Sequence, residues 1–424
     1  MYFEQFYLTC LSHASYMVGS GGIAAVVDPQ RDVAIYLEEA RKNNLRIEHI
    51  LETHLHADFV SGHRELADAT GARIYLGWRA GARFPHVPVR DGVEIAFGNC
   101  RLRFLETPGH TLESISIVVT DLDRSPDPFA VFTGDTLFIG NVGRPDLSGD
   151  HTPQQLAALL YDSLHEKLLR LPEAVRVYPA HGAGSLCGRQ MSAERSSTIG
   201  KERAFNYALR ASSRDGFVRL VTEDLPERPK YFSADVELNR AGAAPLAELP
   251  GIPALTSRQA LAHQRQGAII LDTRPVQEFG AAHVAGALHI ALSGQFATWA
   301  GILIGLDTSI ILVAEDEERM RESRIRLARV GIERVIGYLD GGIAGWTASR
   351  LPAEQVTQIS APDDLAATLD GLDPACATAI HCKGGYRSSI AASLLERAGF
   401  QQVFNVTGGF DAWCTCGLPY VCET

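Results

Sequence analysis

The run Thr53-His-Leu-His-Ala-Asp-Phe59 holds the densest group of metal-ligating side chains in this chain of 424 residues. His54, His56 and Asp58 occur at every second position, so in an extended segment all three side chains project to the same side. Imidazole and carboxylate groups are ligands that Zn²⁺ and non-haem iron accept. Phe59 then places an apolar ring where a further ligand could have stood, which bears on whether the site holds one ion or two.

Three further candidate ligands follow short apolar segments later in the chain, and they are His110, Asp135 and His181. Each lies in a loop with Gly or Pro beside it, after a segment that we expect to be a strand. Loops at strand ends are where α/β layers present functional groups. One such histidine alone is more often structural, but four such segments together favour a shared site.

The segments that would position these loops alternate between strand-like and helix-like patterns over residues 1–245. Gly22–Asp28 is expected to be a strand and Ser61–Thr70 a helix that ends at Gly71. Five prolines lie between Pro226 and Pro253, and we expect this stretch to be the connection between domains.

Composition limits the partners that need to be considered. The formal net charge is −11 and 46% of the residues are hydrophobic, which is typical of a globular protein and argues against a nucleic-acid partner. No apolar run is long enough to span a bilayer, and the N-terminal residues have the pattern of a strand instead of a signal peptide. Eight cysteines scattered over the chain do not suggest a disulfide framework. We therefore expect a cytoplasmic protein with no membrane contact.

The segments HLHAD, PGHT, TGDTLF and PAHG, in this order, resemble the metallo-β-lactamase superfamily. The resemblance covers residues 1–245 and implies an αββα sandwich with a metal at one edge of two packed sheets. In members with two metal ions, the position of Phe59 is a histidine that binds the second ion. The resemblance therefore implies a single ion in this chain.

Within the superfamily, the chain most resembles persulfide dioxygenases, which hold one Fe(II) per chain by two histidines and a carboxylate. Carried over by motif, the iron ligands are His54, His110 and Asp135. The resemblance leaves three groups that either support these ligands or are relics of a second metal site, namely His56, Asp58 and His181. Such a triad leaves positions open for O₂ and a substrate sulfur, whereas a hydrolytic zinc site needs one activated water.

Two residues in segments that also resemble this subgroup have two interpretations each. Arg144 could pair with a substrate carboxylate or make a structural salt bridge, and we weigh the two equally. Cys187 could be reactive, although a buried structural thiol is the more common case.

Cys382 is a second candidate reactive group, because it ends an apolar strand and precedes a glycine-containing loop and a helix. Backbone N–H groups of such a loop and the helix N-terminus stabilise a thiolate. Lys383 and Arg387 add positive charge that suits an anionic sulfur substrate. The pattern Cys-x-x-Gly-x-Arg resembles the active loop of rhodanese sulfurtransferases, in which the cysteine carries a sulfane sulfur. That resemblance implies that the substrate contacts Gly384, Gly385 and Tyr386; the alternative is a buried cysteine before an ordinary turn.

The C-terminal part repeats itself, since Arg326–Gly331 and Asp340–Trp346 match Leu394–Gly399 and Thr407–Trp413. We expect a first rhodanese-like copy over residues 254–352 and a second over residues 353–424. Aligning the copies on their shared glycines places Ala314 opposite Cys382, so the first copy lacks the nucleophile.

The second copy is shortened at its N-terminal side, because few residues precede Cys382. Its first strand is expected within Val356–Ile359 and its first helix at Pro362–Leu369. The fold class expected for the whole chain is therefore α/β: an αββα sandwich followed by two rhodanese-like units, the second truncated.

These features predict a fused enzyme of sulfide detoxification. The first domain would oxidise a low-molecular-weight persulfide with O₂ to a thiol and sulfite, and Cys382 would transfer sulfur to form or use thiosulfate. Glutathione, coenzyme A and other small thiols are all compatible as the carrier, and the resemblance implies a homo-oligomer. The alternative is a zinc thioester hydrolase of the glyoxalase II type, with a sulfur-carrier module at its C-terminal side.

Overall fold

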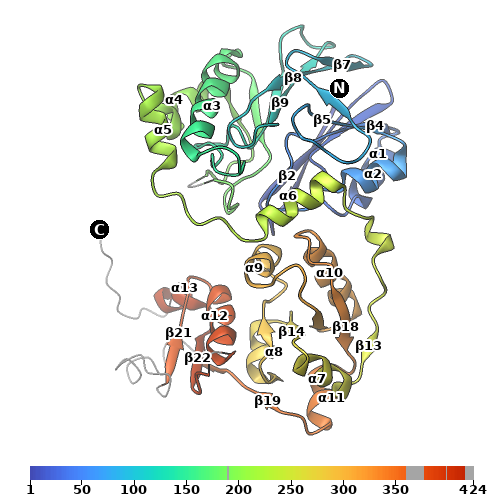
Figure 1. Cartoon of the computed structure of the whole chain (residues 1–424), viewed down its shortest axis with the longest axis vertical. Helices are drawn as coiled ribbons and strands as arrows, with labels where there is room; N and C mark the ends of the chain where they lie inside the picture. The colour runs from blue at the N-terminus through green and yellow to red at the C-terminus, as the bar shows by residue number, and fades with distance from the viewer. Residues whose placement is uncertain (189–190, 360–376, 398, 416–424) are drawn as a thin grey trace. The chain divides into compact units, whose positions relative to one another are not determined.

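The computed structural model describes residues 1–188, 191–359, 377–397 and 399–415. Its backbone contacts divide the chain into two compact units, which appear in Figure 1. The N-terminal unit consists of Met1–Leu249 with Ala328–Gly331, and the C-terminal unit of Pro250–Leu327 with Ile332–Thr424. Within the described ranges, no helix is long and apolar enough to cross a membrane.

Two six-stranded sheets form the centre of the N-terminal unit. The first has the order β1-β2-β3-β4-β5-β6, with the bounds Tyr2–Leu8, His13–Ser20, Ile23–Val27, Arg46–Leu51, Arg73–Gly77 and Val87–Val89. The second sheet has the order β12-β11-β10-β9-β8-β7. Its strands are β7 (Glu94–Phe97), β8 (Cys100–Glu106), β9 (Ile115–Asp121), β10 (Ala130–Gly134), β11 (Arg176–Pro179) and β12 (Ser197–Thr198).

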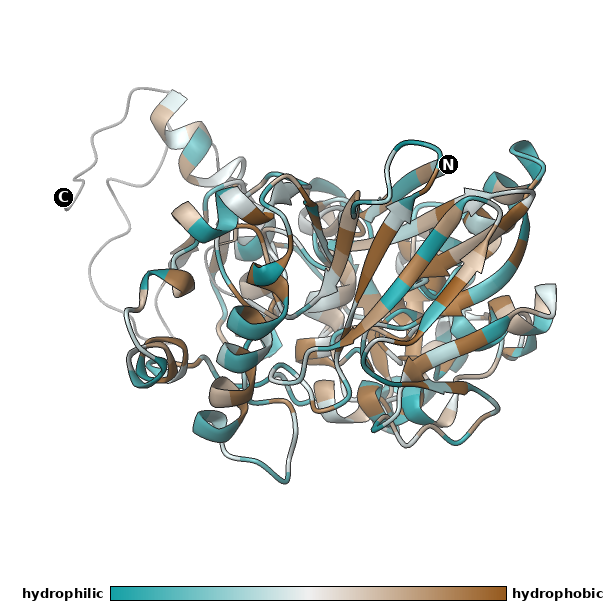
Figure 2. Ribbon diagram, turned by 90° about the horizontal axis from the view of Figure 1, so that it is seen from above, coloured by the Kyte–Doolittle hydropathy of each residue, from teal (hydrophilic) through white to brown (hydrophobic). Residues whose placement is uncertain are grey.

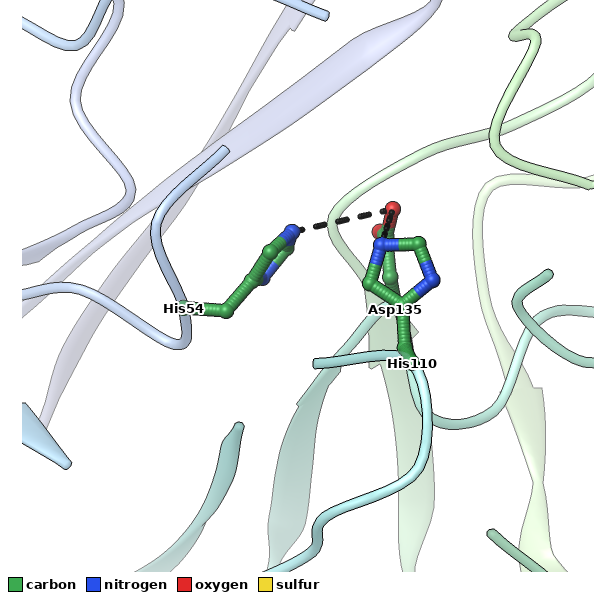
Figure 3. A group of neighbouring side chains, drawn as sticks. All are labelled: His54, His110 and Asp135. Atoms are coloured by element: carbon green, nitrogen blue, oxygen red, sulfur yellow. Dashed lines mark ion pairs between the residues drawn. The ribbon is translucent and has the colours of Figure 1, made fainter. Parts of the chain in front are cut away.

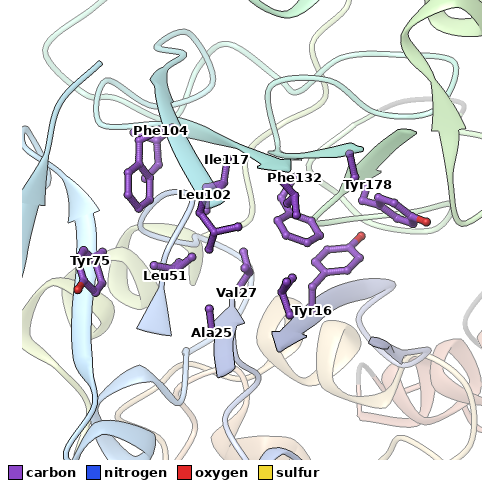
Figure 4. Close-up of a cluster of buried hydrophobic side chains, with 14 of the residues drawn as sticks. Tyr16, Ala25, Val27, Leu51, Tyr75, Leu102, Phe104, Ile117, Phe132 and Tyr178 are labelled. Atoms are coloured by element: carbon purple, nitrogen blue, oxygen red, sulfur yellow. The ribbon is translucent and has the colours of Figure 1, made fainter. Parts of the chain in front are cut away.

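The inner faces of the two sheets share one apolar core (Figure 4). Strand β3 illustrates why: Ala25 and Val27 face this core, and Ala24 and Val26 belong to a second cluster with helices. A strand buried on both faces reads as a continuous apolar run, because successive side chains point to opposite sides. Figure 2 shows apolar residues concentrated in the strands, with polar residues on the helices and loops around them.

Helices cover the outer faces of both sheets and complete four layers. On the first sheet these are α1 (Ala34–Lys42) and α2 (His63–Thr70). On the second they are α3 (Pro153–Glu166) and α5 (Arg214–Thr222), with η1 (Leu168–Arg170), α4 (Ile199–Phe205) and η2 (Ala208–Arg210) near them. Gly71 ends α2 in the left-handed conformation at φ 74°, as the sequence predicted. The predicted αββα sandwich is thus confirmed.

The proline-containing stretch before residue 254 is not a simple connection, and that prediction was wrong in part. It contains helix α6 (Phe232–Ala241) and the turn η3 (Leu246–Glu248). Phe232 and Asn239 are buried, at 1% exposure each. Helix α6 therefore packs into the N-terminal unit although its flanks have the composition of a linker.

The first copy in the C-terminal unit is a parallel sheet of order β13-β18-β17-β14-β16. These strands are Ala254–Leu255, Val335–Leu339, Ile310–Val313, Ile269–Asp272 and Leu288–His289. Its helices α7 to α11 are Ser257–Arg265, Val276–Ala281, Phe296–Leu303, Glu317–Ala328 and Gly342–Ala348.

The second copy is smaller, with a parallel sheet of order β20-β22-β21. Its strands are Thr357–Ile359, Val403–Val406 and Thr378–Ile380, and its helices are α12 (Tyr386–Arg397) and α13 (Gly409–Thr415). A short antiparallel pair, β15 (His283–Val284) with β19 (Ala353–Glu354), lies at the passage from the first copy to the second. The helix predicted at Pro362–Leu369 lies outside the described residues.

Candidate metal centre and cysteine loop

Three loops bring the predicted iron ligands together (Figure 3). His54 follows β4, His110 lies between β8 and β9, and Asp135 directly follows β10. The Nε2 atoms of His54 and His110 lie 3.8 and 3.4 Å from Oδ2 of Asp135. All three side chains are buried. The geometry is that of two imidazoles and a carboxylate converging on one point.

Hydrogen bonds made by Nδ1 determine that each imidazole directs Nε2 toward Asp135. Nδ1 of His110 lies 2.9 Å from the carbonyl oxygen of Arg144, which can only accept, so Nδ1 donates and Nε2 keeps its lone pair. Nδ1 of His54 lies 3.0 Å from Oγ1 of Thr53. That hydroxyl donates its own hydrogen to Asp28 at 2.8 Å, so it accepts from the imidazole. Both Nε2 lone pairs therefore point toward Asp135.

The donor set suits a metal cation. Nε2 of His54, Nε2 of His110 and Oδ2 of Asp135 are buried without a hydrogen-bond partner among the described residues. Burial lowers the pKa of both histidines. Burial would raise the pKa of Asp135, but the neighbouring His181, His110 and His54 hold it well below its ordinary value. Neutral imidazoles and an ionised carboxylate are the states that bind a metal.

Two glycines allow the loops to approach this closely. Gly134 precedes Asp135 at φ 52°, and a Cβ there would lie 2.6 Å from Oγ1 of Thr53. A Cβ on Gly143 would lie 2.0 Å from the carbonyl oxygen of Asp135 and 2.9 Å from Nδ1 of His110. Both positions therefore exclude larger residues.

His181 and Asp58 lie beside the triad and hold its carboxylate. Nδ1 of His181 is 2.8 Å from Oδ1 of Asp135, and its Nε2 is 3.0 Å from Oδ2 of Asp58. Burial alone would lower the pKa of His181, but the two carboxylates raise it well above its ordinary value. The imidazolium thus bridges both carboxylates and leaves Oδ2 of Asp135 directed at the histidines.

His56 and Phe59 occupy the other side of this group. Nε2 of His56 lies 3.2 Å from Oδ1 of Asp28 and 3.7 Å from Oε2 of Glu52. The ring of Phe59 is fully buried, with its centroid 4.3 Å from that of His56 and 4.1 Å from that of His13. An apolar ring therefore fills the space among these histidines.

Sequence reasoning missed four residues that support the site, and they are His13, Asp28, Glu52 and Asn239. Asp28 directly follows β3 and Glu52 directly follows β4, which is a pattern that could have indicated them. Asn239 of α6 donates from Nδ2 to the carbonyl oxygens of His56 and Phe59, at 2.8 Å each. No local pattern marks Asn239, because its partners are far away in the sequence.

Arg144 and Cys187 both have buried contacts. The Arg144 guanidinium donates to both carboxylate oxygens of Asp146, at 2.7 and 2.9 Å, and to the carbonyl oxygens of Leu186 and Pro226. Arg144 thus makes the contacts of a structural salt bridge, which was the second of the two interpretations of this residue. Burial raises the pKa of Cys187 well above its ordinary value, which opposes reactivity. A cavity of about 130 Å³ lies next to Gly143, Arg144 and Tyr207.

The Cys382 loop is built from one short segment between β21 and α12. The N–H of Gly385 donates to Sγ of Cys382 at 3.1 Å, and the hydroxyl of Ser388 lies 3.6 Å from the same sulfur. Burial raises the pKa of Cys382, but hydrogen bonds from Ser388, Gly384 and Gly385 outweigh it and bring the pKa below its ordinary value. The loop therefore favours a thiolate at a half-buried position.

The remaining loop residues lie around this sulfur. Lys383 and Arg387 are exposed, and the Tyr386 hydroxyl donates to the carbonyl oxygen of Ala291 in the first copy at 3.1 Å. The N–H of Phe410 donates to the carbonyl oxygen of Cys382 at 2.6 Å. In the first copy, Ala314 directly follows β17, whereas Cys382 of the second copy lies two residues after the end of β21.

Family comparisons agree with this division of the chain. The metallo-beta-lactamase superfamily model matches residues 8–181, and the rhodanese-like domain model matches residues 256–349 and 353–416. The chain therefore belongs to the metallo-β-lactamase superfamily, with rhodanese-like domains in its C-terminal half.

Particular relatives include two kinds of enzyme. The mitochondrial persulfide dioxygenase ETHE1 of Bos taurus is 30% identical over 222 residues, covering 51% of this chain and 78% of that protein. A hydroxyacylglutathione hydrolase of Hahella chejuensis is 31% identical over 243 residues, which cover 57% of this chain and 88% of the hydrolase.

Two solved structures of related proteins are similar to this chain in fold. A metallo-beta-lactamase from Staphylococcus aureus has a TM-score of 0.72 at 31% identity and covers 80% of this chain and 98% of that one. ETHE1 from Myxococcus xanthus has a TM-score of 0.50 at 30% identity, and the match covers 57% of this chain and 99% of that structure. The architecture is thus shared with both.

Proposed function

We propose that the N-terminal unit is a persulfide dioxygenase with one Fe(II) per chain, held by His54, His110 and Asp135. The observation that carries this proposal is Phe59, which fills the place of a second-metal ligand with a buried apolar ring. A dinuclear hydrolytic site needs that ligand, whereas a mononuclear oxygenase site does not. The relationship to ETHE1 supports the same choice.

The overall reaction converts a persulfide RSSH with O₂ and water into the thiol RSH and sulfite, with release of protons. When bound, Fe(II) in such a triad offers open positions to O₂ and to a sulfur anion. The protein residues prepare this site: hydrogen bonds donated by Nδ1 orient both imidazoles, and His181 fixes one oxygen of Asp135. Phe59 keeps the adjacent space apolar and excludes water from it.

The Cys382 loop would carry the second reaction. With Cys382 as a persulfide, the sulfur lone pair of sulfite attacks the terminal sulfur and forms a new S–S bond. The bond between Cys382 and that sulfur breaks, and its electron pair returns to Cys382 as a thiolate while thiosulfate leaves. Gly384, Gly385 and Ser388 stabilise this thiolate by hydrogen bonds. Lys383 and Arg387 attract the anionic partners, and the reverse reaction uses the same groups.

A glyoxalase II-type hydrolase is the second candidate, since hydroxyacylglutathione hydrolases match at similar identity. His181 and Asp58 retain ligand-type side chains beside Asp135, which would favour it. In that case the C-terminal unit would act as a sulfur carrier. The proposal in either form includes a cytoplasmic homo-oligomer that acts on small thiol derivatives.

Metal analysis of anaerobically purified full-length protein, together with O₂ uptake, tests this proposal. We expect one iron per chain, and O₂ consumption with glutathione persulfide that yields sulfite in equal amount. Tightly bound zinc, no O₂ uptake and hydrolysis of a glutathione thioester would contradict the dioxygenase and support the hydrolase.

The variant Phe59→His sharpens the same test. It restores an imidazole beside Asp58 and His181, so we expect the bound metal to rise from one ion to two per chain. A second ion in the unsubstituted protein would contradict the role given to Phe59.

A further inference from the structure

A second group of metal-ligating side chains lies in the C-terminal unit, where the two copies meet. His283 of β15 pairs in register with Glu354 of β19. Glu396 lies near the C-terminal end of α12, the helix that begins at the Cys382 loop. One ligand atom from each of the three residues lies within 4.8 Å of the others.

The His283 imidazole is fixed in a single orientation. Its Nδ1 lies 2.9 Å from the carbonyl oxygen of Phe279, which can only accept, so Nδ1 donates. Its ring stacks on that of Phe279 with centroids 3.8 Å apart and planes at 15°. Nε2 is therefore the nitrogen directed away from this strand, and it carries the lone pair in the neutral ring. A histidine held through Nδ1 by a carbonyl is the usual arrangement of a metal ligand.

Two of the three facing atoms lack a hydrogen-bond partner among the described residues, whereas Oε2 of Glu354 accepts a hydrogen bond from the N–H of Gly286 at 3.1 Å. Nε2 of His283 and Oε2 of Glu396 are both buried without a hydrogen-bond partner among the described residues, and His283 is fully buried. They lie 3.3 Å apart, and Nε2 lies 3.8 Å from Oε2 of Glu354. A nitrogen lone pair facing a buried carboxylate is unfavourable unless a proton or a metal cation lies between them.

The spacing matches a small tetrahedral ion. With metal–nitrogen and metal–oxygen bonds of about 2.0 Å, tetrahedral ligand atoms are about 3.3 Å apart. One imidazole with two carboxylates suits Zn²⁺ and similar transition ions better than Mg²⁺ or Ca²⁺, which prefer oxygen ligands only. The Glu354 side chain is 48% exposed, so ions and a water ligand can reach the site from that side.

We propose that His283, Glu354 and Glu396 bind a divalent transition-metal ion, represented by Zn²⁺, that joins the two rhodanese-like copies. In the described part of the second copy, α12 packs on β22 and β21 of its own sheet, and it also contacts β16 of the first copy. The ion would fasten the C-terminal end of this helix, whose N-terminal end supports Cys382. This inference does not depend on the chemistry proposed for the N-terminal unit.

Zinc binding to full-length protein carrying His54→Ala and His110→Ala tests the proposal, because the iron triad is then removed as a competing site. Titration calorimetry should detect one more Zn²⁺ per chain in this background than after the further substitution Glu396→Gln. Glu354→Gln should weaken the same binding event about tenfold or more. Zn²⁺ should also raise the unfolding temperature of the C-terminal unit in the background protein, and this rise should disappear with Glu396→Gln.

Glu317→Gln on the exposed face of α10 is the matched control and should leave zinc binding unchanged. Equal zinc stoichiometry and an equal zinc-dependent rise in unfolding temperature with and without Glu396→Gln would overturn the proposal. A loss of stability in Glu396→Gln that zinc does not influence would also overturn it, because His283 would then hold a proton and form a simple ion pair.

Discussion

The candidate metal centre takes His54, His110 and Asp135 from three separate loops, whereas the cysteine loop takes its main groups from one segment around Cys382. The triad is fully buried, and Cys382 is half buried. At the triad, protonation is set by residues that are distant in sequence, such as His181. At Cys382 it is set by Ser388 and the glycines of the same loop.

Because the two sites are assembled differently, they should respond differently to substitutions. A site assembled from distant loops depends on the packing of the whole unit, so remote substitutions should change it. A site within one strand–loop–helix segment should respond mainly to changes inside that segment. The two sites can therefore be tested against each other in the same full-length protein.

Cys382→Ser should have the largest effect, because it removes the nucleophile itself. We expect thiosulfate sulfurtransferase activity to fall by about 10³-fold or more, with O₂ uptake on glutathione persulfide unchanged. Assaying both activities in one preparation checks this. Cys414→Ser, at a half-buried position on α13, is the matched control. Sulfur transfer that survives Cys382→Ser would show that another thiol carries the sulfur.

His110→Ala should have the next largest effect, on the other site. Loss of a ligand should reduce iron content and O₂ uptake by about 10²-fold or more, while sulfur transfer at Cys382 remains. Elemental analysis and an oxygen electrode measure the two quantities. His165→Ala on α3, where the imidazole contacts only a carbonyl of its own helix in the described hydrogen bonds, is the control. Full iron content in His110→Ala would remove this residue from the ligand set.

Asn239→Ala tests whether the metal centre responds to a residue that does not face the metal. The buried carbonyl oxygens of His56 and Phe59 would lose their donor, at a cost of about 1–3 kcal/mol in the free energy of unfolding. We expect iron affinity to fall about tenfold, with sulfur transfer unaffected. Denaturant unfolding and iron titration would show this. Unchanged iron affinity would contradict the dependence of the site on α6.

Ser388→Ala should have the smallest effect and should be confined to the cysteine loop. Removing its hydroxyl removes a hydrogen bond that lowers the pKa of Cys382, so that pKa rises and less thiolate is present at neutral pH. We expect sulfur transfer at pH 7 to fall several-fold, with rates that approach those of the unsubstituted protein at alkaline pH. A pH profile of the same shape and position as before would contradict this.

The comparison also explains which features the sequence could predict. The candidate metal ligands and the cysteine lie in short motifs whose chemistry is visible in neighbouring residues, and the sandwich follows from the alternation of apolar strands and helices. The αL cap at Gly71 follows from local conformational preference in the same way.

Helix α6 shows what local patterns could not predict. The N-cap residue Tyr231, which precedes the helix, makes no side-chain capping hydrogen bond, and prolines and glycines flank the helix. The helix depends on tertiary contacts, through the burial of Phe232 and the hydrogen bonds of Asn239. For Arg144, the salt-bridge partner Asp146 is only two residues away and could have been considered, whereas the carbonyl partners at Leu186 and Pro226 are distant in the sequence.

Helix α6 also determines where this protein can be divided into exchangeable modules. A fusion that joined a different C-terminal partner at Pro226 would delete Asn239 and leave carbonyl groups inside the metal loop unpaired. A junction after Leu249 keeps these carbonyl groups paired, but it removes Ala328–Gly331, which belong to the same compact unit. The stretch with the composition of a spacer thus belongs structurally to the N-terminal unit, and recombination that preserves the candidate metal site must retain it.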